Sequence, residues 1–130
     1  ADVVLNLIHV DKLNSKNSSF QALRVMDKRE FLASTDRSFR PVNMTVGPDG
    51  ALYVVDMYRQ VIEHPEWIPD EIEKTLDLNA GKDKGRIYRI ARKGMEHTWD
   101  VKSLNSVEGM IANLSHSNQW IRIQAQRLLM

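Results

Sequence analysis

Residues 39–90 read FRPVNMTVGPDGALYVVDMYRQVIEHPEWIPDEIEKTLDLNAGKDKGRIYRI, and this stretch is the most informative feature of the sequence. Two short β-patterned runs, residues 42–46 and 51–56, flank the tetrapeptide Gly47-Pro48-Asp49-Gly50. The proline presets φ for a turn and the final glycine accepts a positive φ, so the stretch predicts a tight β-hairpin. Residues 86–90 (RIYRI) predict a further short strand that pairs beside this hairpin.

A long polar and aromatic excursion separates the hairpin from the last strand. Pro69, followed by acidic residues, predicts a helix through about Leu76. We expect Ile62, Trp67 and Ile68 to pin the excursion onto the sheet, and stacking of Trp67 on a sugar ring is the less favoured alternative. A hairpin interrupted by such an insertion is typical of a β-propeller blade that carries a functional loop.

The flanking sequence extends this interpretation. Residues 3–10 and 20–26 predict strands, and residues 12–19 predict a polar loop between them. We therefore expect a mainly β fold with some α-helix, in which residues 1–93 form one to two blades from the C-terminal part of a propeller. Residues 94–104 are expected to be a linker. Two apolar stripes in residues 105–130 predict an αα-hairpin that starts a HEAT-like or armadillo-like repeat domain. A blade needs neighbours, so the chain is expected to be part of a larger protein.

Bulk composition excludes several classes of protein. The net charge is +1, with 18 basic and 17 acidic side chains intermixed, so the chain has no basic stripe for nucleic acid. It also has no apolar run of about 20 residues, the length of a membrane span. The absence of cysteine excludes disulfides, thiolate metal sites and covalent haem attachment within these 130 residues.

Five chemically active side chains, Asp56, Tyr58, Arg59, Glu63 and His64, lie within nine residues after the hairpin. In a functional interpretation, Arg59 clamps a quinone carboxylate or a substrate anion, and His64 takes the proton as a hydroxyl group is oxidised. Asp56 or Glu63 then orients His64 or binds calcium through carboxylate oxygens. In the structural alternative, Asp56 caps a turn, Arg59 pairs with Glu63, and His64 packs beside Pro65.

Two other features are weaker candidates for a site. His9 lies in an apolar run beside Asn6, where a hydrogen-bonded core histidine is the favoured interpretation and a channel-facing histidine is the alternative. Residues 77–83 resemble the start of a calcium loop but fail the EF-hand template, because glycine is one place early and Tyr88 stands where glutamate is required. His97 and His116 are expected in a linker and a helix turn, without a site role.

Three sequence segments carry a resemblance to a known family: residues 39–59 (FRPVNMTVGPDGALYVVDMYR), 61–69 (VIEHPEWIP) and 85–90 (GRIYRI). They resemble the large planctomycete-type membrane-bound dehydrogenases. That family combines a β-propeller similar to glucose and sorbosone dehydrogenases with HEAT-like repeats and a cytochrome c domain. The chain lacks Cys-x-x-Cys-His, so any haem would lie in a domain outside it.

The resemblance implies a periplasmic or secreted protein that uses pyrroloquinoline quinone and calcium. It implies catalytic roles for His64, Arg59 and Asp56, cofactor contacts from Arg59, Tyr58, His9 and Arg40, and metal ligation by Asp56 and Glu63. The first functional hypothesis is thus a fragment of a quinoprotein-like dehydrogenase, which would oxidise a sugar or alcohol beside the rest of its propeller. The alternative is a binding module for polysaccharide or protein without redox chemistry.

Overall fold

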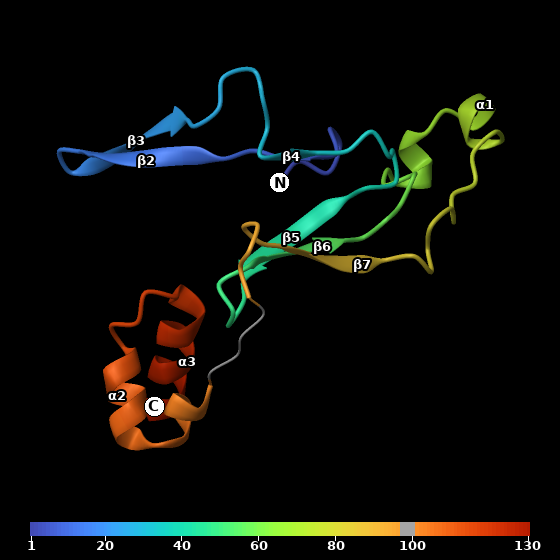
Figure 1. Ribbon diagram of the computed structural model, residues 1–130. Coiled ribbons are helices and arrows are strands. Elements are labelled where there is room, and N and C mark those ends of the chain that lie inside the picture. The colour runs from blue at the N-terminus through green and yellow to red at the C-terminus, as the bar shows by residue number, and fades with distance from the viewer. Residues whose placement is uncertain (97–100) are drawn as a thin grey trace. The chain divides into compact units, whose positions relative to one another are not determined.

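The computed structural model describes residues 1–96 and 101–130, which form three small sheets and a helical segment (Figure 1). Strands β1 (Leu7–Ile8) and β4 (Leu32–Ala33) pair antiparallel. Strands β2 (Asp11–Lys16) and β3 (Ser19–Arg24) form an antiparallel hairpin. Strands β5 (Pro41–Val46), β6 (Leu52–Asp56) and β7 (Arg86–Ile90) form a third sheet in the order β5-β6-β7.

Helices occupy the excursion and the C-terminal segment. The excursion contains a 3₁₀ turn, η1 (Pro65–Trp67), and one turn of helix, α1 (Asp70–Glu73). A second 3₁₀ turn, η2 (Lys102–Asn105), precedes the helices α2 (Val107–Asn113) and α3 (Gln119–Leu129).

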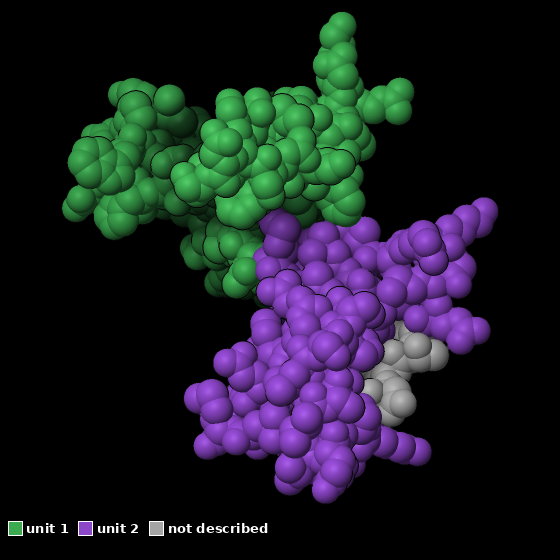
Figure 2. Space-filling model, turned by 90° about the vertical axis from the view of Figure 1, so that its left-hand side faces the viewer, with its two compact units in different colours: residues 1–43, 55–86 green, residues 44–54, 87–130 purple. Residues whose placement is uncertain are grey.

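The chain divides into two compact units, coloured separately in Figure 2. Unit 1 comprises residues 1–43 and 55–86, and unit 2 comprises residues 44–54 and 87–130. The predicted linker, residues 94–104, includes residues 97–100, so His97 lies outside the described residues.

The predicted β5–β6 hairpin is confirmed, and Asp49 organises its turn. Gly50 has φ +77° and donates its N–H to the Gly47 carbonyl at 2.9 Å, as the Gly-Pro-Asp-Gly pattern requires. Asp49 Oδ1 accepts the Ala51 N–H at 3.1 Å, and Asp49 Oδ2 accepts the Arg89 Nε–H at 2.7 Å. Burial by itself raises the pKa of Asp49, but the hydrogen bonds from Arg89, Ala51 and Tyr53 lower it below its usual value. The pairing of β7 beside this hairpin is also confirmed.

The C-terminal helices pack on a small apolar core and are capped by side chains. Leu104, Ile121 and Ala125 are buried together, with Trp120 against them. Asn118 caps α3 by accepting the Trp120 N–H at 2.9 Å, while its amide group donates to the Gly47 and Pro48 carbonyls, both at 2.9 Å. Through Asn118, the start of α3 is therefore joined to the β5–β6 turn inside unit 2.

The predicted fold class, a partial β-propeller followed by a HEAT-type or armadillo-type repeat, is wrong. Propeller blades are four-stranded sheets, whereas the described residues form separate sheets of two, two and three strands. The segment expected to be a loop, residues 12–19, instead supplies most of β2 and its turn. Both strands of that hairpin are almost entirely exposed, so the hairpin is not stacked as blade strands are. The one helical pair described, α2 and α3, shows no HEAT-like repeat pattern.

Two local expectations also need correction. Only Leu7–Ile8 of the expected strand at residues 3–10 is a β-strand, because residues 3–6 form a turn in which Asn6 has φ +57°. The helix expected through Leu76 ends at Glu73, and the next residues continue in single turns, with the Leu76 N–H bound to the Glu73 carbonyl.

Candidate functional site

Asp56 ends β6 and is buried, with 1% of its surface exposed. Its Oδ1 accepts the backbone N–H groups of Arg40 at 2.8 Å and of Tyr58 at 2.9 Å. Its Oδ2 accepts no hydrogen bond from the described residues and lies 3.7 Å from Arg86 Nε. The carboxylate thus joins the start of β5 to the chain after β6, as the turn-capping alternative predicted.

Arg40 is buried and bonds to backbone carbonyls from two segments. Its Nε donates to the Arg59 carbonyl at 2.8 Å, and its two terminal nitrogens donate to the Gln60 carbonyl at 2.8 Å and the Val3 carbonyl at 2.6 Å. A planar guanidinium suits this fork of acceptors. Because these donors are used, Arg40 holds the excursion and the N-terminal turn in place, and a cofactor would have to compete with those bonds.

Tyr58 lies at φ +52°, an unusual conformation for a bulky residue. The Asp56 hydrogen bond to its N–H holds the turn, and the Arg86 guanidinium stacks 3.8 Å from the centre of its ring. A Cβ on Gly81 would lie 2.2 Å from the Tyr58 carbonyl oxygen, so only glycine lets the return loop approach this turn. The aromatic ring predicted to contact a cofactor therefore packs against Arg86 at the start of β7.

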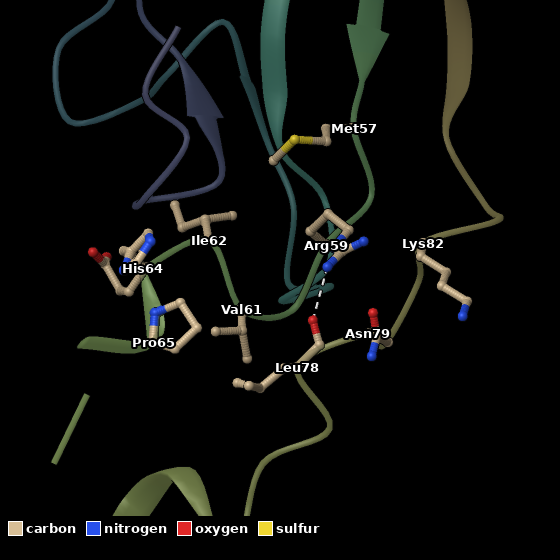
Figure 3. Close-up of a pocket in the computed structure, with 10 residues that line it drawn as sticks. Met57, Arg59, Val61, Ile62, His64, Pro65, Leu78, Asn79 and Lys82 are labelled. Atoms are coloured by element: carbon tan, nitrogen blue, oxygen red, sulfur yellow. Dashed lines mark hydrogen bonds between the residues drawn. The ribbon is translucent and has the colours of Figure 1, made fainter. Parts of the chain in front are cut away.

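Arg59 and His64 line one open cleft of about 670 Å³ in unit 1 (Figure 3). The remaining lining is Met57, Val61, Ile62, Glu63, Pro65, Leu78, Asn79 and Lys82. In this view Arg59, Asn79 and Lys82 lie on one side, and Ile62, His64 and Pro65 on the other. Arg59 donates to the Leu78 carbonyl at 2.7 Å, and exposed His64 accepts the Glu66 N–H at 3.4 Å. Asp56 does not line the cleft, so the predicted catalytic trio does not converge there.

A second groove, of about 440 Å³, borders the same segment and holds Trp67 at its edge. Its lining is Val4, Arg40, Gln60, Val61, Ile62, Glu63, Trp67, Ile68, Pro69 and Leu76. Trp67 has 79% of its surface exposed, so the expectation that it pins the excursion is wrong. Only the less favoured sugar-stacking interpretation of the sequence pointed to this side chain.

His9 is the centre of a separate polar cluster. Its Nδ1 lies 2.6 Å from Glu30 Oε2, and its Nε2 lies 2.9 Å from Asp11 Oδ1. The hydrogen bonds to Glu30 and Asp11 raise the pKa of His9, and the bond from His9, aided by Arg24, lowers the pKa of Glu30. His9 is more than a third exposed, so it is not the core histidine that the sequence favoured, and its partners leave neither ring nitrogen free for a cofactor.

The residues present do not fit the implied calcium and quinone. No group of three or more His, Asp and Glu side chains in residues 1–96 and 101–130 could hold a metal ion. One carboxylate oxygen of Asp56 already accepts hydrogen bonds from two backbone amides. The Glu63 side chain is exposed in the lining of the cleft. Arg40, Tyr58 and His9, the other implied cofactor contacts, are each engaged in the contacts described above.

Comparison with known proteins gives one family. Residues 1–94 match the family described as Domain of unknown function (DUF7133). No curated protein and no solved structure matches the chain. These findings do not bear on the resemblance to dehydrogenases. Among the described helices, none has the length and apolar character needed to cross a membrane. Because the match covers most of the chain, the protein belongs to the DUF7133 family.

Proposed function

We propose that this chain is a carbohydrate-binding module without redox chemistry, and that Trp67 is the surface on which a sugar ring stacks. The observation that carries the proposal is the 79% exposure of Trp67 at the edge of a groove. Burying a large apolar side chain stabilises a protein by about 1.5–3 kcal/mol. The exposed indole of Trp67 does not gain this free energy in the free protein. A ligand with a flat apolar face recovers that free energy.

Two prolines and two hydrogen bonds restrain the backbone around Trp67. Pro65 opens η1, the Trp67 N–H bonds to the His64 carbonyl at 2.9 Å, and the Ile68 N–H bonds to the Pro65 carbonyl at 3.0 Å. Pro69 follows at once and fixes the next backbone torsion. A platform that is already ordered costs little conformational entropy when it binds a ligand.

The groove beside Trp67 offers the two kinds of contact that a pyranose needs. The groove has an apolar wall formed by Val61, Ile62 and Leu76, which can contact the C–H face of a sugar ring. Gln60 and Glu63 lie in the same lining and can bond to hydroxyl groups on its edge. A mostly apolar hollow with a few polar groups is the usual composition of a small-molecule site. The periplasmic or secreted location that the resemblance implies would expose the chain to polysaccharides.

Oxidation of the sugar has less support, because two of the side chains implied in it form hydrogen bonds with the backbone instead. Asp56 and Arg40 bind backbone groups, and His64 has no carboxylate partner closer than 3.9 Å among the described residues. A general base needs an orienting partner within hydrogen-bond reach. The dehydrogenase thus rests on the sequence resemblance alone.

The test is calorimetric titration of the purified chain with neutral gluco-, xylo- and manno-oligosaccharides. We expect saturable binding of at least one series and a roughly 10- to 100-fold loss for Trp67→Ala, from the burial free energy above. Trp67→Phe should keep most of the affinity. Phe20→Ala, which removes a similarly exposed aromatic side chain from β3, is the matched control and should bind normally.

Two outcomes would overturn the proposal. One is the absence of saturable binding to every oligosaccharide, or equal binding by the wild-type chain and Trp67→Ala, and a protein ligand would then be the remaining alternative. The other is sugar-dependent dye reduction when the chain is supplied with pyrroloquinoline quinone and calcium.

A further inference from the structure

We infer, resting on the proposed function, that the preferred ligand is a largely neutral oligosaccharide that carries one isolated uronic acid. The neutral part occupies the groove at Trp67, and the carboxylate occupies the cleft lined by Arg59 and Lys82.

The groove and the cleft are neighbouring subsites of one surface. Val61, Ile62 and Glu63 belong to the lining of both hollows, so this short segment forms the ridge between them. A single ring on Trp67 would fill only the groove. A longer oligosaccharide would cross the ridge and place a neighbouring unit in the cleft.

The side chains that line the cleft can bind one carboxylate. Arg59 is half-buried, and its hydrogen bond to the Leu78 carbonyl anchors one end of the guanidinium. Its Nε and its other terminal nitrogen have no hydrogen-bond partner in the described part of the chain. Lys82 and Asn79 lie on the same side of the cleft in Figure 3. An anchored arginine with free N–H groups can bind a carboxylate in two-point fashion, with a lysine adding charge.

The charge of the wider excursion limits how many carboxylates the ligand can carry. Residues 57–85 contain seven Asp and Glu residues against four Lys and Arg residues. Glu66, Asp70 and Glu71 follow His64 on the Trp67 side of the segment, and their like charge would repel a polyuronate. The charges therefore favour one acidic unit flanked by neutral ones.

The experiment compares three ligands by calorimetry at low and at physiological salt. They are a neutral xylo-oligosaccharide, the same oligosaccharide with one glucuronic acid branch, and an oligogalacturonate. We expect the branched ligand to bind roughly tenfold tighter than the neutral one at low salt, as for one charged hydrogen-bonded pair, and less so at high salt. The oligogalacturonate should bind most weakly.

Arg59→Gln and Lys82→Gln should each reduce the affinity for the branched ligand more than the affinity for the neutral one. Lys82→Gln keeps the test independent of the Arg59–Leu78 contact, and Lys84→Gln, on the same loop but outside the cleft lining, should have no effect. Equal affinity for neutral and branched ligands, or tightest binding of the oligogalacturonate, would overturn this inference and leave the proposed function standing. Failure of both xylo-oligosaccharides and of the neutral panel would refute the proposed function and the inference with it.

Discussion

Replacing Asp56 with alanine should destabilise the chain strongly, because this carboxylate is a structural acceptor. Its Oδ1 is the acceptor for two backbone N–H groups, those of Arg40 at 2.8 Å and Tyr58 at 2.9 Å, and it is buried. A buried donor left without a partner costs about 1–3 kcal/mol, so the pair predicts a loss of about 2–6 kcal/mol. That is a large fraction of the roughly 5–15 kcal/mol by which native proteins are stable.

Urea unfolding, followed by tryptophan fluorescence and circular dichroism, measures this loss directly. Asp56→Asn is the matched control, because it keeps an oxygen acceptor at the same place and should lose less than half as much. Amide hydrogen exchange adds a local measurement, in which the N–H groups of Arg40 and Tyr58 should lose protection in the alanine variant.

A free energy of unfolding for Asp56→Ala within about 0.5 kcal/mol of wild type, the usual effect of a surface change, would refute this account of Asp56. So would loss of oligosaccharide binding by a fully folded Asp56→Ala variant, since the carboxylate would then belong to the site.

Three further predictions follow from other contacts. Arg40→Lys should cost about 2–4 kcal/mol in urea unfolding, because an ammonium cannot reach the carbonyls that the guanidinium spans, and a cost near zero would contradict its structural role. Gly81→Ala should cost at least about 1–2 kcal/mol, since the residue has φ +83° and the new Cβ would strike the Tyr58 carbonyl; unchanged thermal unfolding would count against the described loop. The His9–Glu30 pair should stabilise the chain most between about pH 4.5 and 6.5, the usual pKa values of the two groups. The raised pKa of His9 means that its contribution is lost as the pH rises through the folded value, and the lowered pKa of Glu30 means that its contribution is lost as the pH falls. Unfolding at several pH values should show this maximum, and His9→Gln should flatten it.

The β5–β6 hairpin could be predicted from sequence because its signals are local. The Gly-Pro-Asp-Gly turn fixes the backbone by itself, and Asp49 satisfies a turn N–H two residues away. The caps of the C-terminal helices are equally local, with Ser106 and Asn118 each accepting an N–H two or three residues onward.

The strand β2 was missed because its sequence, DKLNSK, is polar and has no apolar alternation. It exists through antiparallel pairing with β3, and a turn in which Asn17 adopts φ +54° connects the two strands. Pairing between strands is a tertiary property that a single strand does not encode. The propeller interpretation failed for the same reason, since it extended one locally correct hairpin to an assembly.

The candidate site was predicted in its residue types but not in their roles. Charged side chains cluster in residues 56–64, and this clustering by itself does not specify their partners. The Tyr58 N–H that Asp56 accepts is local, but the clustering could not show that Asp56 also binds the Arg40 N–H or that Arg40 binds three backbone carbonyls, because those partners lie 16 or more positions away. The sequence also does not predict that Trp67 is exposed, because an apolar pattern does not indicate which side of a turn faces water.

The most direct test of the central claim is an NMR titration that follows the indole N–H signals as a neutral xylo-oligosaccharide is added. We expect a saturable shift of the Trp67 signal, while the Trp120 signal, from the helical core of unit 2, stays unchanged. A Trp67 signal that stays still while the oligosaccharide binds, or a shift of Trp120 in its place, would contradict the central claim.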